Sequence, residues 1–120
     1  GVRIAVTGRP EGMFDLVVAD VPCSGSGTWR RTPDQKWRLT QGELSRLTTL
    51  QAQILAQAAR HVGKGGHLAY MTCSLLKVEN QAQASGFLSQ NTDFIEIMSQ
   101  KYTPVSESDG FFLSILARSP

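Results

Sequence analysis

The sequence has no long hydrophobic run, little net charge and few cysteines. Its formal net charge is only +2, so no strong overall field points to nucleic acid as a partner. None of its apolar segments approaches the ~20 residues that a membrane-spanning helix needs, and we expect no membrane partner. With 120 residues, of which 41% are hydrophobic, the chain has an ordinary globular composition and forms one domain at most.

Several patterns that signal catalysis or cofactor binding are also absent. The sequence has no Ser-His-Asp arrangement and no zinc-ligand spacing around its two histidines, so no metal site is expected. A Gly-rich turn of the G-x-G-x-x-G kind after the first strand is missing too. Because the chain also starts at Gly1 rather than at a methionine, we expect that a first βαβ unit is missing from it.

What is present is an alternation of apolar segments that predicts an α/β fold. Short apolar runs, rich in Val and Ile, predict strands bounded by turn residues. The predicted strands are residues 2–6, 14–20, 67–71, 94–98 and 111–117.

Two helices are predicted between these strands. Thr40-Gln41-Gly42-Glu43 matches a capping box, in which the threonine caps the helix and the glutamate reaches back, and that helix ends near Gly63. A weaker helix is expected over residues 78–90. Short links between the elements predict right-handed crossovers, with helices on both faces of the sheet. Since no helix separates the last two strands, we expect a mainly parallel sheet with one reversed C-terminal strand.

Two cysteines follow two of these strands. Cys23 stands in the segment DVPCSGSG and Cys73 in YMTCS. The carboxyl ends of parallel strands face the ligand crevice of an open α/β sheet, and neighbouring strands lie about 4.8 Å apart. Both thiols are therefore expected to reach one small substrate. The spacing does not exclude a disulfide, but the β-α-β pattern is typical of intracellular enzymes, and we interpret both cysteines as reduced.

Each residue around these cysteines has a second interpretation. Cys73, flanked by hydroxyl groups, is a candidate nucleophile or a small buried apolar residue. The Ser24-Gly25-Ser26-Gly27 turn after Cys23 is an anion-binding nest or a plain tight turn. Asp20 accepts hydrogen bonds from a ligand amino group or caps the loop.

Two further segments carry polar residues of interest. Residues 29–38 interleave two tryptophans with four cations, which suits phosphate contacts and stacking on unpaired bases; the alternative is a solvated loop. After the second cysteine, Lys77, Glu79 and Asn80 either support that cysteine or only begin the next helix.

Together these motifs resemble a known family. DVPCSGSGTWRRTPDQKW, MTCSLLKVEN and SDGFF are similar to motifs of the NOL1/NOP2/Sun family of RNA cytosine-C5 methyltransferases. The resemblance spans nearly the whole chain. It implies a class I, Rossmann-like fold that uses S-adenosyl-L-methionine to methylate C5 of a cytosine in RNA.

The resemblance also implies roles for individual residues. Cys73 is the nucleophile that adds to cytosine C6, and Cys23 assists either removal of the C5 proton or release of the product. Asp20 holds the target base and, with Pro22, borders the donor pocket.

The RNA backbone is expected to contact three cations of the loop: Arg30, Arg31 and Lys36. The expected substrate is a single-stranded or loop cytosine of rRNA or tRNA.

The family's donor-binding loop has no counterpart in the sequence. We therefore expect residues 1–120 to be the C-terminal portion of a single cytoplasmic methyltransferase domain. Alone it is expected to be inactive, with an incomplete donor pocket, and to self-associate through an exposed sheet edge at residues 14–19. The alternative is a non-catalytic RNA-binding or scaffold remnant with structural cysteines.

Overall fold

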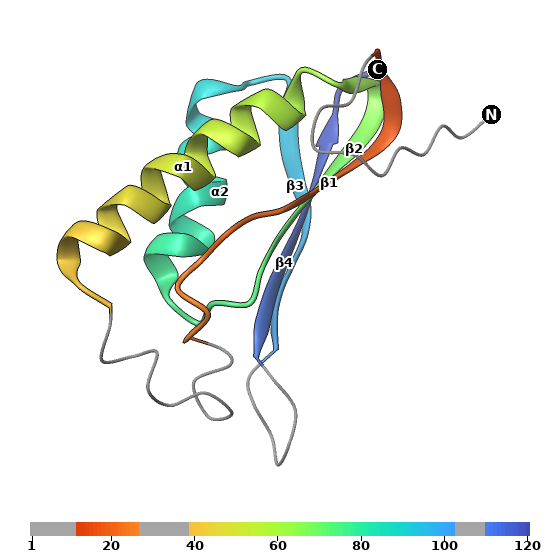
Figure 1. Cartoon of the computed structure of the whole chain (residues 1–120). Helices are drawn as coiled ribbons and strands as arrows, with labels where there is room; N and C mark the ends of the chain where they lie inside the picture. Colours follow the sequence, from red (N-terminus) through yellow and green to blue (C-terminus); the bar gives the residue numbers. More distant parts are fainter. Residues whose placement is uncertain (1–11, 27–38, 103–109) are drawn as a thin grey trace.

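A computed structural model describes residues 12–26, 39–102 and 110–120, which form one sheet covered by two helices (Figure 1). The sheet has the strand order β1-β2-β4-β3. Its strands are β1 (Phe14–Asp20), β2 (Val62–Thr72), β3 (Phe94–Tyr102) and β4 (Phe111–Arg118). β1 pairs parallel with β2, while β4 pairs antiparallel with both β2 and β3. The predicted sheet with one reversed C-terminal strand is confirmed; the predicted strand at residues 2–6 lies outside the described residues.

The first helix, α1, spans Gln41–Ala59 and begins as its sequence predicts. The Thr40 hydroxyl accepts a hydrogen bond from the Glu43 backbone N–H at 3.1 Å. The Glu43 carboxylate does not complete the capping box, because it binds Arg46 one turn further along, at 2.7 Å. One face of α1 packs on the sheet, burying Leu47, Gln51 and Leu55.

Both helices cover the same face of the sheet (Figure 1). The second, α2 (Gln81–Gln90), follows a 3-10 turn, η3 (Lys77–Glu79). From β1 to β2 and from β2 to β3 the chain moves across the sheet in the same direction. Right-handed connections that advance in one direction place their helices on one face. The expectation of helices on both faces is therefore wrong for the described part of the chain.

The start of β2 is longer and less regular than its sequence predicts. Residues 63–66 have turn composition, yet they belong to the strand, and the β1–β2 register shifts beside them between Phe14 and Leu16. At Gly66 the backbones are so close that an added Cβ would lie 2.9 Å from the Gly63 carbonyl oxygen and 3.0 Å from that of Asp15. Only glycine fits this approach without a shift.

The two faces of the sheet differ in composition and in cover. Under the helices lies the core, with Leu55, Leu68, Tyr70 and Leu116 almost completely buried. The opposite face is apolar and is not covered by any described element. Its exposed side chains include Leu16, Val18, Ile95 and Met98. In the part of the chain that the structure describes, β1 is also an edge strand, and no helix there has the length and apolar character that crossing a membrane requires.

Candidate active site

The two cysteines meet where β1 and β2 end. The parallel register places Asp20 opposite Met71, and the Val21 N–H extends the ladder by donating to the Met71 carbonyl at 3.1 Å. Immediately beyond these positions, the sulfur atoms of Cys23 and Cys73 lie 3.4 Å apart. Both cysteines are free. The prediction that the two thiols converge on one site is confirmed.

The two thiols occupy different environments. Cys73 is exposed, whereas Cys23 is only partly accessible. Burial, followed by the hydrogen bond to the Cys73 sulfur, raises the pKa of the Cys23 thiol from 9.0 to about 12, because a charged thiolate is poorly solvated there. Cys23 therefore keeps its proton at neutral pH, and its sulfur lies within hydrogen-bond distance of that of Cys73. Within the pair, the accessible sulfur available for attack is that of Cys73.

A network of hydroxyl groups joins the two loops that carry the cysteines. The Ser26 hydroxyl lies 3.1 Å from that of Ser74 and accepts a bond from the Leu75 N–H at 2.7 Å. Both Ser24 and Ser74 donate to the carboxylate of the fully buried Glu79. This carboxylate therefore contacts both segments. The contact agrees with the interpretation that Glu79 supports the second cysteine rather than only beginning the next helix.

A second pair of contacts fixes the turn after β2. The Thr72 hydroxyl donates to Asn80 Oδ1 at 2.6 Å, and Asn80 Nδ2 donates to the Ser74 carbonyl at 2.8 Å. Thr72, Ser74 and Asn80 are all buried. The turn that presents Cys73 is therefore held from both sides.

The other predicted site residues divide into two groups. Asp20 and Pro22 are exposed at the carboxyl end of β1, and the Pro22 carbonyl accepts a bond from Gln51 Nε2 at 2.9 Å. The three predicted RNA-binding residues lie outside the described residues: Arg30, Arg31 and Lys36.

Gln51 was not anticipated from the sequence. Besides Pro22, its Nε2 atom donates to the Glu79 carboxylate at 2.9 Å, from a completely buried position on α1. The available signal was a polar residue four positions after Leu47 and four before Leu55, within the apolar stripe of an amphipathic helix.

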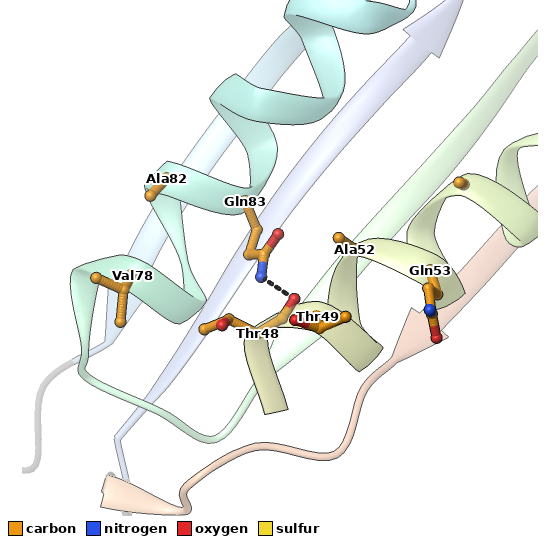
Figure 2. A pocket seen from close by; sticks show the side chains of 8 residues that line it. Thr48, Thr49, Ala52, Gln53, Val78, Ala82 and Gln83 are labelled. Carbon is orange, nitrogen blue, oxygen red and sulfur yellow. Dashed lines mark hydrogen bonds between the residues drawn. The ribbon is translucent and has the colours of Figure 1, made fainter. Parts of the chain in front are cut away.

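A shallow hollow between α1 and α2 lies apart from the cysteines (Figure 2). Gln83 crosses it, with its Nε2 donating to the Thr48 carbonyl at 2.7 Å. The remaining lining is mainly small: Thr49, Ala52, Gln53, Ala56, Val78 and Ala82. Neither this hollow nor the rest of the described chain holds three or more His, Cys, Asp or Glu residues grouped as metal ligands.

Comparison with known families gives this geometry its context. Residues 4–117 match the family described as 16S rRNA methyltransferase RsmB/F. The chain belongs to this family. The family resemblance seen in the cysteine motifs is thereby confirmed.

Individual relatives agree with the family assignment. The chain is 37% identical over 115 residues to Ribosomal RNA small subunit methyltransferase B of Pectobacterium atrosepticum, covering 89% of this chain and 27% of the relative. It is 44% identical over 81 residues to the protein of the same name from Sodalis glossinidius, covering 68% and 19%. The RsmB/F-family chain thus spans about a quarter or less of the length of these relatives.

Solved structures resemble the fold. PH0851 superposes with a TM-score of 0.75 at 32% identity, covering 86% of this chain and 26% of that structure. NSun6 from Pyrococcus horikoshii, solved with SFG, gives a TM-score of 0.78 at 19% identity, covering 91% and 31%. These likenesses confirm the predicted class I methyltransferase fold.

Proposed function

We propose that the protein containing this chain transfers a methyl group from S-adenosyl-L-methionine to C5 of a cytosine in rRNA. The observation that carries the proposal is the pair of free sulfur atoms 3.4 Å apart at the ends of two parallel strands. Membership in the RsmB/F family supplies the substrate class. The proposed reaction proceeds through a covalent bond between Cys73 and cytosine C6.

Cys73 provides the nucleophile. Cytosine C5 is a weak nucleophile in the aromatic base, so attack at C6 divides one difficult reaction into two easier ones. The Cys73 thiolate forms a bond to C6, and the electrons of the C5–C6 double bond move to C5, which then accepts the methyl group. Loss of the C5 proton to a base restores the double bond and expels the Cys73 thiolate.

Cys23 acts at the release step in this proposal. Its raised pKa, caused first by burial and then by the bond to Cys73, keeps the thiol protonated. A protonated thiol is a poor base for the C5 proton but is a hydrogen-bond donor 3.4 Å from the sulfur that must leave. Stabilising the departing thiolate favours product release.

Asp20 and Pro22 are proposed to form one side of the donor site. Asp20 and Pro22 are exposed at the end of β1, where ligands bind in open α/β sheets. When bound, S-adenosyl-L-methionine supplies the methyl group; SFG, found with the NSun6 neighbour, is its analogue. In this proposal the Asp20 carboxylate accepts hydrogen bonds from the amino group of the target base, and Pro22 borders the donor.

The RNA contact is proposed for residues 29–38, a segment that interleaves tryptophans and cations in the sequence. Its cations Arg30, Arg31 and Lys36 suit phosphate oxygens. A cytosine must leave its stack before Cys73 can reach C6, so a single-stranded or loop cytosine is the expected target. The family name indicates rRNA rather than tRNA.

We further propose that residues 1–120 are the C-terminal portion of one cytoplasmic methyltransferase domain. The apolar sheet face opposite the helices and the open edge of β1 need cover in water. On its own the 120-residue chain is expected to self-associate there and to show no methyl transfer.

A trapping experiment on the full-length protein tests the proposed reaction. RNA containing 5-fluorocytosine has no C5 proton to lose, so the Cys73–C6 bond persists after methyl transfer. We expect a covalent protein–RNA complex that disappears in Cys73→Ala. If Cys73→Ala traps RNA as the unsubstituted protein does, the nucleophile lies elsewhere. If neither protein traps RNA, the scaffold or RNA-binding alternative with structural cysteines is favoured.

A further inference from the structure

Glu79 is a completely buried carboxyl group that the proposed reaction does not use. It ends the 3-10 turn η3 and has no solvent exposure. A buried carboxylate is costly unless hydrogen bonds or a cation compensate it. The ion pairs of the described residues are Glu43–Arg46 and Asp93–Arg118, so within this part of the chain Glu79 depends on hydrogen bonds.

Four donors surround the Glu79 carboxylate. Its Oε1 atom accepts from the hydroxyls of Ser24 at 2.5 Å and Ser74 at 2.6 Å. Its Oε2 atom accepts from the Ser24 backbone N–H at 2.8 Å and from Gln51 Nε2 at 2.9 Å. Every partner donates, as suits an ionised carboxylate, which only accepts. Hydrogen bonds to a charged group are also stronger than those between neutral groups.

Two of the residues that donate to Glu79 directly follow the two cysteines in the sequence. Ser24 directly follows Cys23, and Ser74 directly follows Cys73. One carboxylate therefore contacts the residue next to each thiol, although the two serines are fifty positions apart. The bond to the Ser24 N–H fixes backbone, not only a side chain, so it restricts the turn that carries Cys23.

We propose that Glu79 is a positioning residue, which sets the separation of the Cys23 and Cys73 sulfur atoms by holding Ser24 and Ser74 on one carboxylate. The inference rests on the methyltransferase function proposed above. Glu79 does not touch substrate in this view. It holds both thiols in a geometry in which one attacks and the other assists departure.

The test compares Glu79→Gln with the unsubstituted full-length protein. An amide has one accepting oxygen, and its nitrogen donates. The amide oxygen can keep the bonds from the Ser24 N–H and from Gln51, and the Ser24 and Ser74 hydroxyls can rotate to accept from the amide nitrogen. The variant therefore retains the shape of the side chain, but weaker bonds to a neutral group replace the bonds to a charged one, which loosens its hold on the loops. Because misplacement by about 1 Å can cost about 100-fold in rate, we expect kcat to fall by 10-fold to about 100-fold with little change in KM for RNA.

A second measurement reports the sulfur positions without any catalysis. Treatment with hydrogen peroxide oxidises the Cys23 and Cys73 thiols to a disulfide. In this reaction each thiol loses one proton and one electron, and one molecule of peroxide is reduced to two molecules of water. This bond forms only when the sulfurs can come within bonding distance. We expect Cys23–Cys73 crosslinking in folded Glu79→Gln to be much slower than in the unsubstituted protein. Ser24→Ala, which keeps the backbone bond, should show a smaller decrease.

Controls separate positioning from general stability. Glu43→Gln removes an exposed carboxylate bound to Arg46 and should change neither readout. The proposal is overturned if Glu79→Gln keeps normal kcat and crosslinking. Circular dichroism measures the folded fraction of the variant. The proposal is also overturned if the activity of Glu79→Gln falls only in proportion to this fraction and the folded molecules crosslink at the normal rate. If the unsubstituted protein does not trap RNA, the proposed function fails, and the crosslinking rates still decide whether Glu79 positions the thiols.

Discussion

The sulfur atom of Cys23 lies 3.4 Å from that of Cys73, and Cys23 is the less accessible of the two thiols. The contact joins the ends of β1 and β2 across fifty residues of sequence. The two thiols are also chemically unequal, because Cys23 is partly buried and its pKa is raised, whereas Cys73 is exposed. Unequal thiols in contact are what a reaction needs when one sulfur attacks and the other remains protonated.

The first prediction concerns the order in which the thiols react. At pH 7.5, iodoacetamide should modify Cys73 well before Cys23, because the thiolate is the reactive form and burial raises the pKa of Cys23 to about 12. Modification of Cys23 should become appreciable only as the pH rises above 9. Peptide mass spectrometry after timed quenching measures both rates. Equal rates at pH 7.5 would show that the two environments do not differ as the structure indicates.

The second prediction separates attack from release. Cys23→Ala removes the donor beside the departing Cys73 sulfur but leaves the nucleophile in place. We expect covalent protein–RNA complex to accumulate with ordinary cytosine RNA, at reduced turnover. Cys73→Ala should form no complex. Gel electrophoresis under denaturing conditions measures the complex, and Cys23→Ser, which restores a protonated donor, is expected to recover part of the turnover. If Cys23→Ala turns over normally, Cys23 has no role in release.

The sequence predicted the order of the elements because their signals are local. The Thr40 cap, the apolar runs of β1 and β4 and the lack of a helix between the last two strands each depend on neighbouring residues. The convergence of the thiols also followed, since parallel strands bring their carboxyl ends to one edge.

The features that sequence reasoning missed depend on distant partners. Residues 63–66 have turn composition, but the approach of β1 at Asp15 and Phe14 makes them part of β2. β3 extends beyond the predicted end at residue 98 to Tyr102, because β4 pairs with this polar segment. The segment has no alternation of apolar and polar residues that would predict a strand. Gln51 donates a hydrogen bond to Glu79, which lies 28 residues further along the sequence, and the local sequence around neither residue predicts this contact.

The third prediction concerns stability at alkaline pH. Burial raises the pKa of the Tyr70 phenol above its ordinary value of 10.0, and that of Cys23 is raised from 9.0. The unfolded chain therefore loses these protons at a lower pH than the folded protein. The stability that both groups contribute is fully present below pH 9 and is lost as the pH rises towards the folded values. Urea unfolding from pH 7.5 to 10.5 should show a falling free energy of unfolding.

Tyr70→Phe is the matched variant for this dependence. It removes the hydrogen bond from the Tyr70 hydroxyl to the Glu79 carbonyl, 2.6 Å long, and should cost about 1 kcal/mol at pH 7.5. Its free energy of unfolding should then fall less steeply above pH 10 than that of the unsubstituted protein. Parallel pH profiles of the two proteins would show that the phenol contributes nothing to the alkaline loss.

The fourth prediction compares two glycines with opposite surroundings. Gly66→Ala places a Cβ within 3.0 Å of two backbone carbonyl oxygens and 3.2 Å from a third, that of Phe14. Backbone cannot move aside as a flexible side chain can, so this variant should be destabilised by about 1–3 kcal/mol. Gly86→Ala, within α2, meets no atom within 4 Å. It should stabilise the protein by roughly 0.5–1 kcal/mol, because glycine is a poor helix former. Urea unfolding measures both changes, and a Gly66→Ala variant as stable as the unsubstituted protein would contradict the close packing of β1 against the start of β2.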